Sequence, residues 1–442
     1  MQEKTITGFS RLSKNEKIEW VAQHWLKHPV QAAQLLRSFW HDDDALQSIL
    51  DGFSENTLTN YYMPFGIAPN MRINERIYAV PMVIEESSVV AAASSAAKFW
   101  LQRGGFQARV LSTTKVGQVH FSWSGNFAQI QPHFDALKEC LLAEATHLTG
   151  NMVKRGGGIL NIEWIDLTHL EPQYHQLKVT FETCDSMGAN FINSVLEQFG
   201  RSLRVFVQGM DNLSERDRDL TIIMAILSNY TPECVVRAEV QCPVGKLEGA
   251  CGDLDPLAFA KKFQKAVRIA EIDPYRATTH NKGIFNGVDA VVLATGNDFR
   301  AVEACGHTHA ARDGQYRSLS HCDVSDGTFR FWMELPLALG TVGGLTKLHP
   351  LAKLSLELLG NPSAAQLMEI IVSTGLAQNF AAVRSLTTTG IQKGHMKMHL
   401  QNILNHLGAS EAEKERAQQH FTDKTVSFTA VREFLESGAT VK

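Results

Sequence analysis

The 442-residue chain lacks any apolar run long enough to cross a membrane, and its first residues include no apolar segment of the kind that directs export. It also lacks a strong net charge, because 42 Lys and Arg residues are balanced by 46 Asp and Glu residues. A nearly neutral surface gives no general attraction for nucleic acid or for an acidic membrane. We therefore expect a cytoplasmic protein that binds neither nucleic acid nor membrane.

Paired cysteines are missing too: the seven cysteines are scattered singly, without a Cys-x-x-Cys motif. This pattern argues against a disulfide framework or a zinc ribbon and predicts reduced thiols. Cys305, His307 and His309 are close in sequence, but on a helix side chains two residues apart point in different directions. His395 and His399 share a helical face without an acidic third ligand nearby. No metal site is expected.

The common nucleotide-binding motifs are also absent. None of the 32 glycines forms Gly-x-Gly-x-x-Gly after a strand. Gly245 and Lys246 are followed by Leu247 instead of the hydroxyl residue of a P-loop, and His-Glu-x-x-His does not occur. These absences argue against a Rossmann domain, a P-loop NTPase and a zincin.

The chain is longer than a single hydrophobic core usually supports, which predicts two or more domains. Helices are expected at 14–26, 32–40 and 44–52, a strand at 76–84, and a helix from Ser87 or Ser88 to about residue 103. Residues 108–229 follow the order strand, helix, strand, strand, helix, strand of a ferredoxin-like (split βαβ) module.

After this module we expect a helix at 256–270, a polar loop at 273–287, an apolar strand at 290–294 and a helix from near Asn297. Residues 411–442 read as charged helix with little sign of a core. The expected fold is α+β. A large mixed helical and sheet domain (1–108 and 230–388) carries an inserted ferredoxin-like domain (109–229) and a helical C-terminal flap (389–442).

Two segments place ionisable groups in unusual surroundings. Glu85 and Glu86 end an apolar strand, where an acid is costly unless it is used or paired; a helix N-terminus could also favour Glu86. The 273–287 segment could be an ordinary solvated loop, but its many donors suit an anionic or carbonyl-bearing ligand. These donors are Arg276, His280, Asn281, Lys282 and Asn286.

Two further segments each contribute one ionisable residue. Asn297 and Asp298 precede a predicted helix, where either side chain could serve as its N-cap. His395 lies between Gly394 and Met396, and a histidine there can donate a proton near neutral pH or can simply be a surface residue.

Taken in order, the four segments resemble signature stretches of the class II hydroxymethylglutaryl-CoA reductases. The resemblance continues through 185–190, 226–229, 340–350 and 375–379, and it is weakest in 199–221 and near the C-terminus. It implies reduction of hydroxymethylglutaryl-CoA to mevalonate and CoA by two NAD(P)H, or the reverse reaction. It also implies a homodimer, or a higher assembly of dimers, with active sites at the interface.

The same resemblance assigns catalytic roles to Glu86, Lys282, Asp298 and His395. Lys282 would stabilise the oxyanion formed from the thioester, and Asp298, between Lys282 and Glu86, would raise the proton affinity of Glu86. Glu86 would then donate protons to the substrate, and His395 would protonate the departing CoA thiolate.

The resemblance further implies residues for substrate and cofactor binding. Arg276 would bind the substrate carboxylate. The other expected substrate contacts are Ser88, Asn286 and Gln378. The expected cofactor contacts are Asp185, Met187, Gly188, Ala189, Asn190, Thr149 and Asn229.

Cofactor preference depends on the position of Thr149. NADH-preferring members carry an acid there, and its replacement by Thr149, with Lys154 and Arg155 nearby, favours NADPH over NADH.

One departure from the family pattern and two rival functions leave alternatives open. Glu55–Asn60 keeps only the first two residues of the usual Glu-Asn-Val-Ile-Gly segment, which affects the expected interface. A lysine-dependent lyase using Lys282 and a non-catalytic acyl-CoA-binding homologue remain rival hypotheses.

Overall fold

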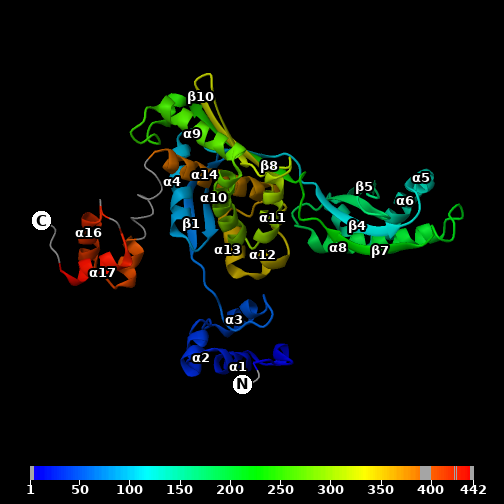
Figure 1. The fold of residues 1–442 in the computed structure, drawn as a ribbon, viewed down its shortest axis with the longest axis horizontal. Coiled ribbons are helices and arrows are strands. Elements are labelled where there is room, and N and C mark those ends of the chain that lie inside the picture. The colour runs from blue at the N-terminus through cyan, green and yellow to red at the C-terminus, as the bar shows by residue number, and fades with distance from the viewer. Residues whose placement is uncertain (1–3, 389–399, 423, 425, 439–442) are drawn as a thin grey trace.

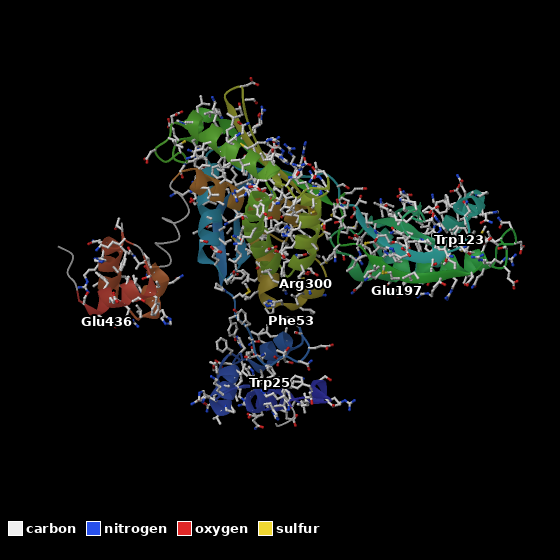
Figure 2. All side chains as sticks on the ribbon, viewed as in Figure 1. Trp25, Phe53, Trp123, Glu197, Arg300 and Glu436 are labelled. Atoms are coloured by element: carbon white, nitrogen blue, oxygen red, sulfur yellow. The ribbon has the colours of Figure 1, made fainter. Side chains whose placement is uncertain are left out.

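A computed structural model describes residues 4–388, 400–422, 424 and 426–438. The N-terminal helices α1 (Lys14–Trp25), α2 (Pro29–Ser38) and α3 (Asp44–Asp51) form an arm below the main body (Figure 1). Ser13 starts α1 through a capping box with Glu16, as the sequence predicted. The arm meets the main body where the ring of Phe53 stacks on His349, with centroids 5.5 Å apart (Figure 2).

The main body contains two sheets. One pairs β1 (Phe65–Ile73) with β2 (Arg76–Val83). The other is antiparallel in the order β3-β8-β10-β9, formed by Gln107–Val110, Val235–Pro243, Thr328–Pro336 and Ser320–Ser325. Alternate residues of β10, including Phe329 and Phe331, are buried in the main core. The sequence predicted β2 but missed β1, β8, β9 and β10.

Helices fill the rest of the main body. They are α4 (Ser87–Leu101), α9 (Pro256–Ile272), α10 (Pro274–Ala294), α11 (Phe299–Ala310), α12 (Gly344–Leu348), α13 (Pro350–Leu358) and α14 (Ala364–Thr387). The buried α14 packs against α4, α9 and α10. The predicted starts of α4, α9 and α11 are confirmed within two residues.

The predicted polar loop at 273–287 and strand at 290–294 are wrong, because α10 covers both. Asp273 caps α10 by accepting from Tyr275 N at 3.0 Å, and Pro274 occupies the first helical position. The segment resembles a polar loop in sequence because two of its polar residues are buried in the helix, where each has a hydrogen-bond partner. His280 Nε2 lies 2.6 Å from Ser320 Oγ, and Asn281 Nδ2 donates to Arg317 O at 2.8 Å.

A third sheet has its own core and lies apart from the main body (Figure 1). Its antiparallel order is β5-β6-β4-β7, with strands Gly158–Asp166, Tyr174–Glu182, Lys115–Trp123 and Leu220–Leu227. The helices beside it are α5 (Phe127–Ile130), α6 (Phe134–Glu144), α7 (Thr146–Val153) and α8 (Ala189–Gln208). The connectivity β4-α6-β5-β6-α8-β7 follows the βαββαβ order. Val110, expected to open this module, belongs instead to β3 of the main sheet.

The C-terminal helices α16 (Glu411–His420) and α17 (Phe428–Glu436) pack with a helix at 400–406. The expectation that this segment has little core is wrong. Its apolar residues are widely spaced in sequence but gather when the helices fold together. The buried cluster comprises Leu400, Ile403, Leu404, Ala417, Phe421, Val431 and Phe434.

Across the described part of the chain, no helix combines the length and apolar character that spanning a membrane requires.

Candidate functional site

An acid and a lysine from distant segments meet beside the end of β2. Glu86 is the N-cap residue of α4, and its Oε2 lies 3.8 Å from Lys282 Nζ on α10. Ser88 Oγ donates a short hydrogen bond to Glu86 Oε1. The Lys282 side chain is 65% exposed and that of Glu86 38% exposed, so a ligand can reach both groups. The fold therefore brings together three residues named from the sequence.

The expected substrate residues on α10 lie on its partly exposed surface, but not all on one face. Lys282 and Asn286 are four residues apart and so occupy one helical face, with Arg276 nearer the N-terminus. Burial lowers the pKa of Arg276, which still leaves a permanently charged guanidinium. Arg276, six residues before Lys282, lies about 120° around the helix from it, so α10 presents a cation and an amide on one face and a second cation beside them. This combination suits an anionic substrate with a carbonyl group.

Gln378 lies deeper than expected for a substrate contact. Its side chain is 5% exposed, and its Oε1 is buried without a hydrogen-bond partner among the described residues. It packs where α14 crosses α10 at Gly287. A Cβ on Gly287 would lie 2.8 Å from Gln378 Cβ and 2.9 Å from Thr374 O, so only glycine permits this close crossing.

Asp298 does not lie between Lys282 and Glu86 within one chain, as the sequence reading expected. It caps α11, accepting from Arg300 N at 3.1 Å, and pairs with the Arg300 side chain at 3.0 Å. Burial acts to raise the pKa of Asp298, but the bonds and charge of Arg300 together hold it below its usual value. Twelve residues of α10 separate Lys282 from Ala294, which corresponds to about 18 Å of helix.

A cleft of about 480 Å³ separates the inserted sheet domain from the main body. Ser186 to Phe191, at the start of α8, form one wall together with Asn151, Met152 and Arg155. The opposite wall consists of 296–298, which includes Asp298, and of Gly340 and 342–346. The expected cofactor residues Met187, Gly188, Ala189 and Asn190 therefore face the main body across this cleft.

The backbone at the start of α8 is arranged for close approach. Gly188 adopts φ +85° and caps the helix without a side-chain hydrogen bond. A Cβ there would lie 2.5 Å from Thr183 Cγ2, and one on Gly340 would lie 2.6 Å from Met187 N. Both positions therefore need glycine. An uncapped helix N-terminus offers N–H groups and positive potential to a phosphate group.

Asp185 ties this loop to the main body. Its Oδ1 accepts from Ala364 N at the start of α14 at 2.7 Å. Its carbonyl oxygen accepts from Thr341 N at 2.9 Å and Val342 N at 3.3 Å. Asp185 thus supports the cleft walls through its own hydrogen bonds.

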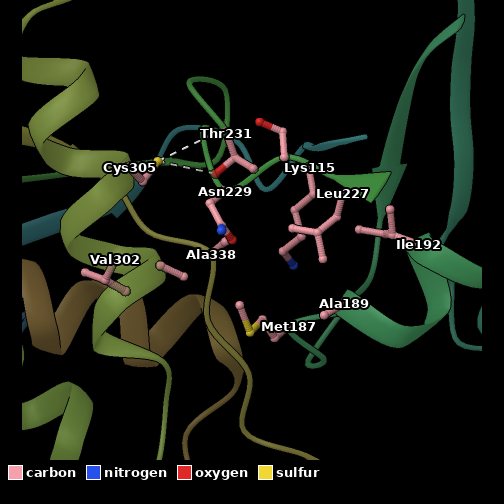
Figure 3. Close-up of a pocket in the computed structure, with 12 residues that line it drawn as sticks. Lys115, Met187, Ala189, Ile192, Leu227, Asn229, Thr231, Val302, Cys305 and Ala338 are labelled. Carbon is pink, nitrogen blue, oxygen red and sulfur yellow. Dashed lines mark hydrogen bonds between the residues drawn. The ribbon is translucent and has the colours of Figure 1, made fainter. Parts of the chain in front are cut away.

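The other two expected cofactor residues differ in position. Asn229 lines a smaller cavity with Met187 and Ala189, next to the same loop (Figure 3). Thr149 is buried in α7, where its Oγ1 donates to Thr146 O at 3.4 Å, and it is not among the residues of the cleft wall. Arg155, farther along the chain, lines the cleft instead.

Sequence reasoning did not single out Lys115. This lysine is 3% exposed at the start of β4 and reaches the 183–188 loop. The available signal was a lysine beginning an otherwise apolar alternating strand, where a buried charge needs a reason.

The expected catalytic His395, like His399, falls outside the described residues.

The clustered residues of α11 have separate partners. Cys305 Sγ accepts from Thr231 N at 3.4 Å, and His307 Nδ1 lies 2.7 Å from Tyr316 OH. Burial lowers the pKa of His309 to about 4. Within the described ranges, no group of three or more His, Cys, Asp and Glu side chains could hold a metal ion.

Comparison with known proteins gives consistent matches over nearly the whole chain. A family model described as hydroxymethylglutaryl-coenzyme A reductase matches residues 14–400. The 3-hydroxy-3-methylglutaryl-coenzyme A reductase of Archaeoglobus fulgidus is 32% identical over 433 residues, covering 98% of this chain and 94% of that protein.

Solved structures of the corresponding Streptococcus pneumoniae protein are also similar. One has a TM-score of 0.71 at 37% identity and covers 98% of this chain and 100% of its own. Another is the class II enzyme bound to NADPH in open conformations, with a TM-score of 0.70 at 36% identity and coverage of 96% and 99%.

Proposed function

Because this chain belongs to the hydroxymethylglutaryl-coenzyme A reductase family, we propose that it reduces 3-hydroxy-3-methylglutaryl-CoA to mevalonate and CoA with two NADPH. The observation that carries the proposal is the cleft between the start of α8 and the segment containing Asp298. In this cleft, a helix N-terminus suited to binding phosphate lies opposite an acid expected in catalysis. The resemblance to the class II enzyme supports assignment to that branch.

The cleft fits a dinucleotide. Its volume of about 480 Å³ lies in the range of small-molecule and cofactor sites, and Gly188 leaves the first amides of α8 free of a side-chain cap. When bound, NADPH would supply the reducing equivalents, two molecules being needed to convert a thioester into an alcohol. Met187, Gly188, Ala189 and Asn190 would hold its phosphates and fix its orientation.

Lys282 and Glu86 are proposed to act on the substrate carbonyl. The Lys282 ammonium would stabilise the negative charge that develops on the thioester oxygen, the type of interaction that usually gives the largest electrostatic contribution. Glu86, held by Ser88 and 3.8 Å from Lys282, would deliver the proton that the oxygen needs. Asn286 would bind the hydroxymethylglutaryl group on the face that carries Lys282, and Arg276 would bind its carboxylate from the neighbouring face of α10, with Gln378 behind them.

We propose a homodimer because one chain keeps Asp298 far from the Glu86 and Lys282 pair. About 18 Å of helix separates Lys282 from the end of α10 that precedes Asp298. A second copy could supply its own Asp298 to the pair, which would place the active site at the interface. His395 is proposed to protonate the CoA thiolate. The seven free cysteines support a cytoplasmic location.

The preference for NADPH is assigned to Arg155 because it lines the cleft, whereas Thr149 is buried and its hydroxyl bonds to Thr146 O. A guanidinium binds a phosphate with paired hydrogen bonds, which suits the 2′-phosphate that distinguishes NADPH from NADH.

The test is nicotinamide absorbance with hydroxymethylglutaryl-CoA and NADPH or NADH. We expect two NADPH oxidised per thioester. Lys282→Met should lose at least about three orders of magnitude in turnover, or about 4 kcal/mol of transition-state stabilisation. The exposed Lys262→Met on α9 serves as the matched control and should keep normal activity.

Two other outcomes would favour the rival functions. Borohydride trapping of substrate on Lys282 without dinucleotide binding would support the lyase. Binding of acyl-CoA by folded protein that oxidises neither dinucleotide would support a non-catalytic homologue.

A further inference from the structure

A buried lysine lies directly behind the loop that leads into α8. Lys115 begins β4, the first strand of the inserted sheet, and its side chain is 3% exposed. Its Nζ donates to Thr183 Oγ1 at 2.5 Å and to Ser186 O at 3.1 Å. Figure 3 shows the side chain directed toward the loop that carries Met187 and Ala189. The ammonium therefore contacts the cofactor loop beside a small cavity, which Lys115 lines together with main-body residues such as Ala301 and Ala338.

The acceptors of Lys115 are a hydroxyl and a carbonyl, so neither hydrogen bond neutralises its charge. Burial lowers the pKa of Lys115, and the neighbouring Cys234, Glu182, Cys184 and Asp185 only partly oppose this effect. A buried charge without a close counter-ion reduces the stability of a fold. Buried ionisable groups with a shifted pKa are common at functional sites.

The contacted loop is held in one conformation. Thr183 Oγ1, besides accepting from Lys115, donates to Ser186 O at 2.6 Å, and Ser186 N donates to Thr183 O at 3.0 Å. Ser186 Oγ in turn accepts from Gly188 N at 3.1 Å. Lys115 therefore binds both ends of the Thr183–Ser186 turn, which leads directly into the uncapped first turn of α8.

We propose that Lys115 is a positioning residue for the dinucleotide: it fixes the 183–188 loop and adds buried positive charge behind the amides that face the pyrophosphate. This role rests on the proposed function of the cleft. In the low dielectric of the interior, the charge acts on a bound pyrophosphate more strongly than a surface lysine would. The bound dianion would in turn add to the counter-charge of Glu182 and Asp185, which only partly opposes the effect of burial on the pKa of Lys115.

The test compares Lys115→Met, which keeps the length of the side chain but removes its charge and donors, with the wild type. Direct NADPH binding should weaken by at least about tenfold, and KM for NADPH should rise similarly. At saturating NADPH, kcat and the affinity for hydroxymethylglutaryl-CoA should change by less than about threefold. The thermal midpoint should not fall, because the variant removes a buried charge. Lys178→Met is the control, because Lys178 is a half-exposed lysine on β6 of the same sheet.

The outcomes separate this inference from the proposed function. If the wild type binds NADPH and Lys115→Met binds it equally well, the inference is wrong. If Lys115→Met instead loses thermal stability and both ligands together, Lys115 is a structural residue only. Should that variant fail to fold, Thr183→Val removes one acceptor of Lys115 and should by itself weaken NADPH binding; unchanged binding would overturn the proposal. Failure of the wild type to bind any dinucleotide would count against the proposed function instead.

Discussion

Replacing Gly188 by alanine should damage dinucleotide binding while leaving the fold intact. The residue adopts φ +85°, a conformation that costs a residue with a Cβ about 1–2 kcal/mol. The new methyl would lie 2.5 Å from Thr183 Cγ2 and 2.9 Å from Thr183 Cβ, and overpacking of this kind adds about 1–3 kcal/mol. Relief requires movement of the loop that shapes the start of α8. If only about 2 kcal/mol of this cost falls on binding, NADPH affinity drops about 30-fold.

The assay is fluorescence titration of NADPH, combined with thermal unfolding. Gly150→Ala on α7 is the matched control because its new Cβ meets nothing within 4 Å and the residue lies in a helix. There alanine should be neutral or stabilise the protein by up to about 1 kcal/mol.

A second substitution tests the steric reasoning. Thr183→Ser removes Cγ2, the nearest clashing atom, but keeps the hydroxyl that bonds Lys115. Added to Gly188→Ala, it should recover part of the lost NADPH affinity, about fivefold. Wild-type binding by Gly188→Ala, or no recovery in the double variant, would refute the account of this loop.

Two further predictions follow from single side chains. Arg155→Ala should raise KM for NADPH by at least about tenfold, the scale of a lost charged hydrogen bond, with little effect on KM for NADH. Lys154→Ala, outside the cleft wall, should change neither KM value. Equal losses for both dinucleotides would contradict this role of Arg155. Burial and the neighbouring Glu303 raise the pKa of Asp289 to about 8 from 3.8, so ionisation of Asp289 costs stability increasingly from about pH 4 to pH 8. Asp289→Asn should therefore gain stability relative to the wild type by up to about 4 kcal/mol between pH 5 and pH 8, measured by urea unfolding; a difference independent of pH would contradict the raised pKa.

Local signals predicted the helix starts well but failed where tertiary contacts dominate. Ser13 and Asp298 each precede a helix and cap it through backbone amides, so their chemistry is visible in the sequence. In α10, buried His280 and Asn281 interrupt the apolar stripe because Ser320 and Arg317 satisfy them from distant positions. No local pattern reveals such partners. The Asp273-Pro274 pair did mark the helix start and was overlooked.

The sequence predicted which residues belong to the site better than it predicted how these residues are arranged in space. Glu86 and Lys282, almost two hundred positions apart, lie within 4 Å of each other, so two of the expected catalytic residues meet in the fold. The same reasoning placed Asp298 beside them, although the length of α10 separates it from Lys282 within one chain. Thr149 was assigned to the cofactor from its sequence position alone, but the turn of α7 buries its hydroxyl.

The hydrogen bonds of Asp185 set a condition on protein engineering. A chimera that exchanged only the inserted sheet for one of different cofactor preference would also exchange this aspartate, whose partners, Ala364, Thr341 and Val342, belong to the recipient. In a functional chimera, the loop of the donor must therefore fit residues 341–342 and the first turn of α14 of the recipient. The sheet module can therefore be exchanged only together with the segments that bind Asp185, which lie more than a hundred residues farther along the chain.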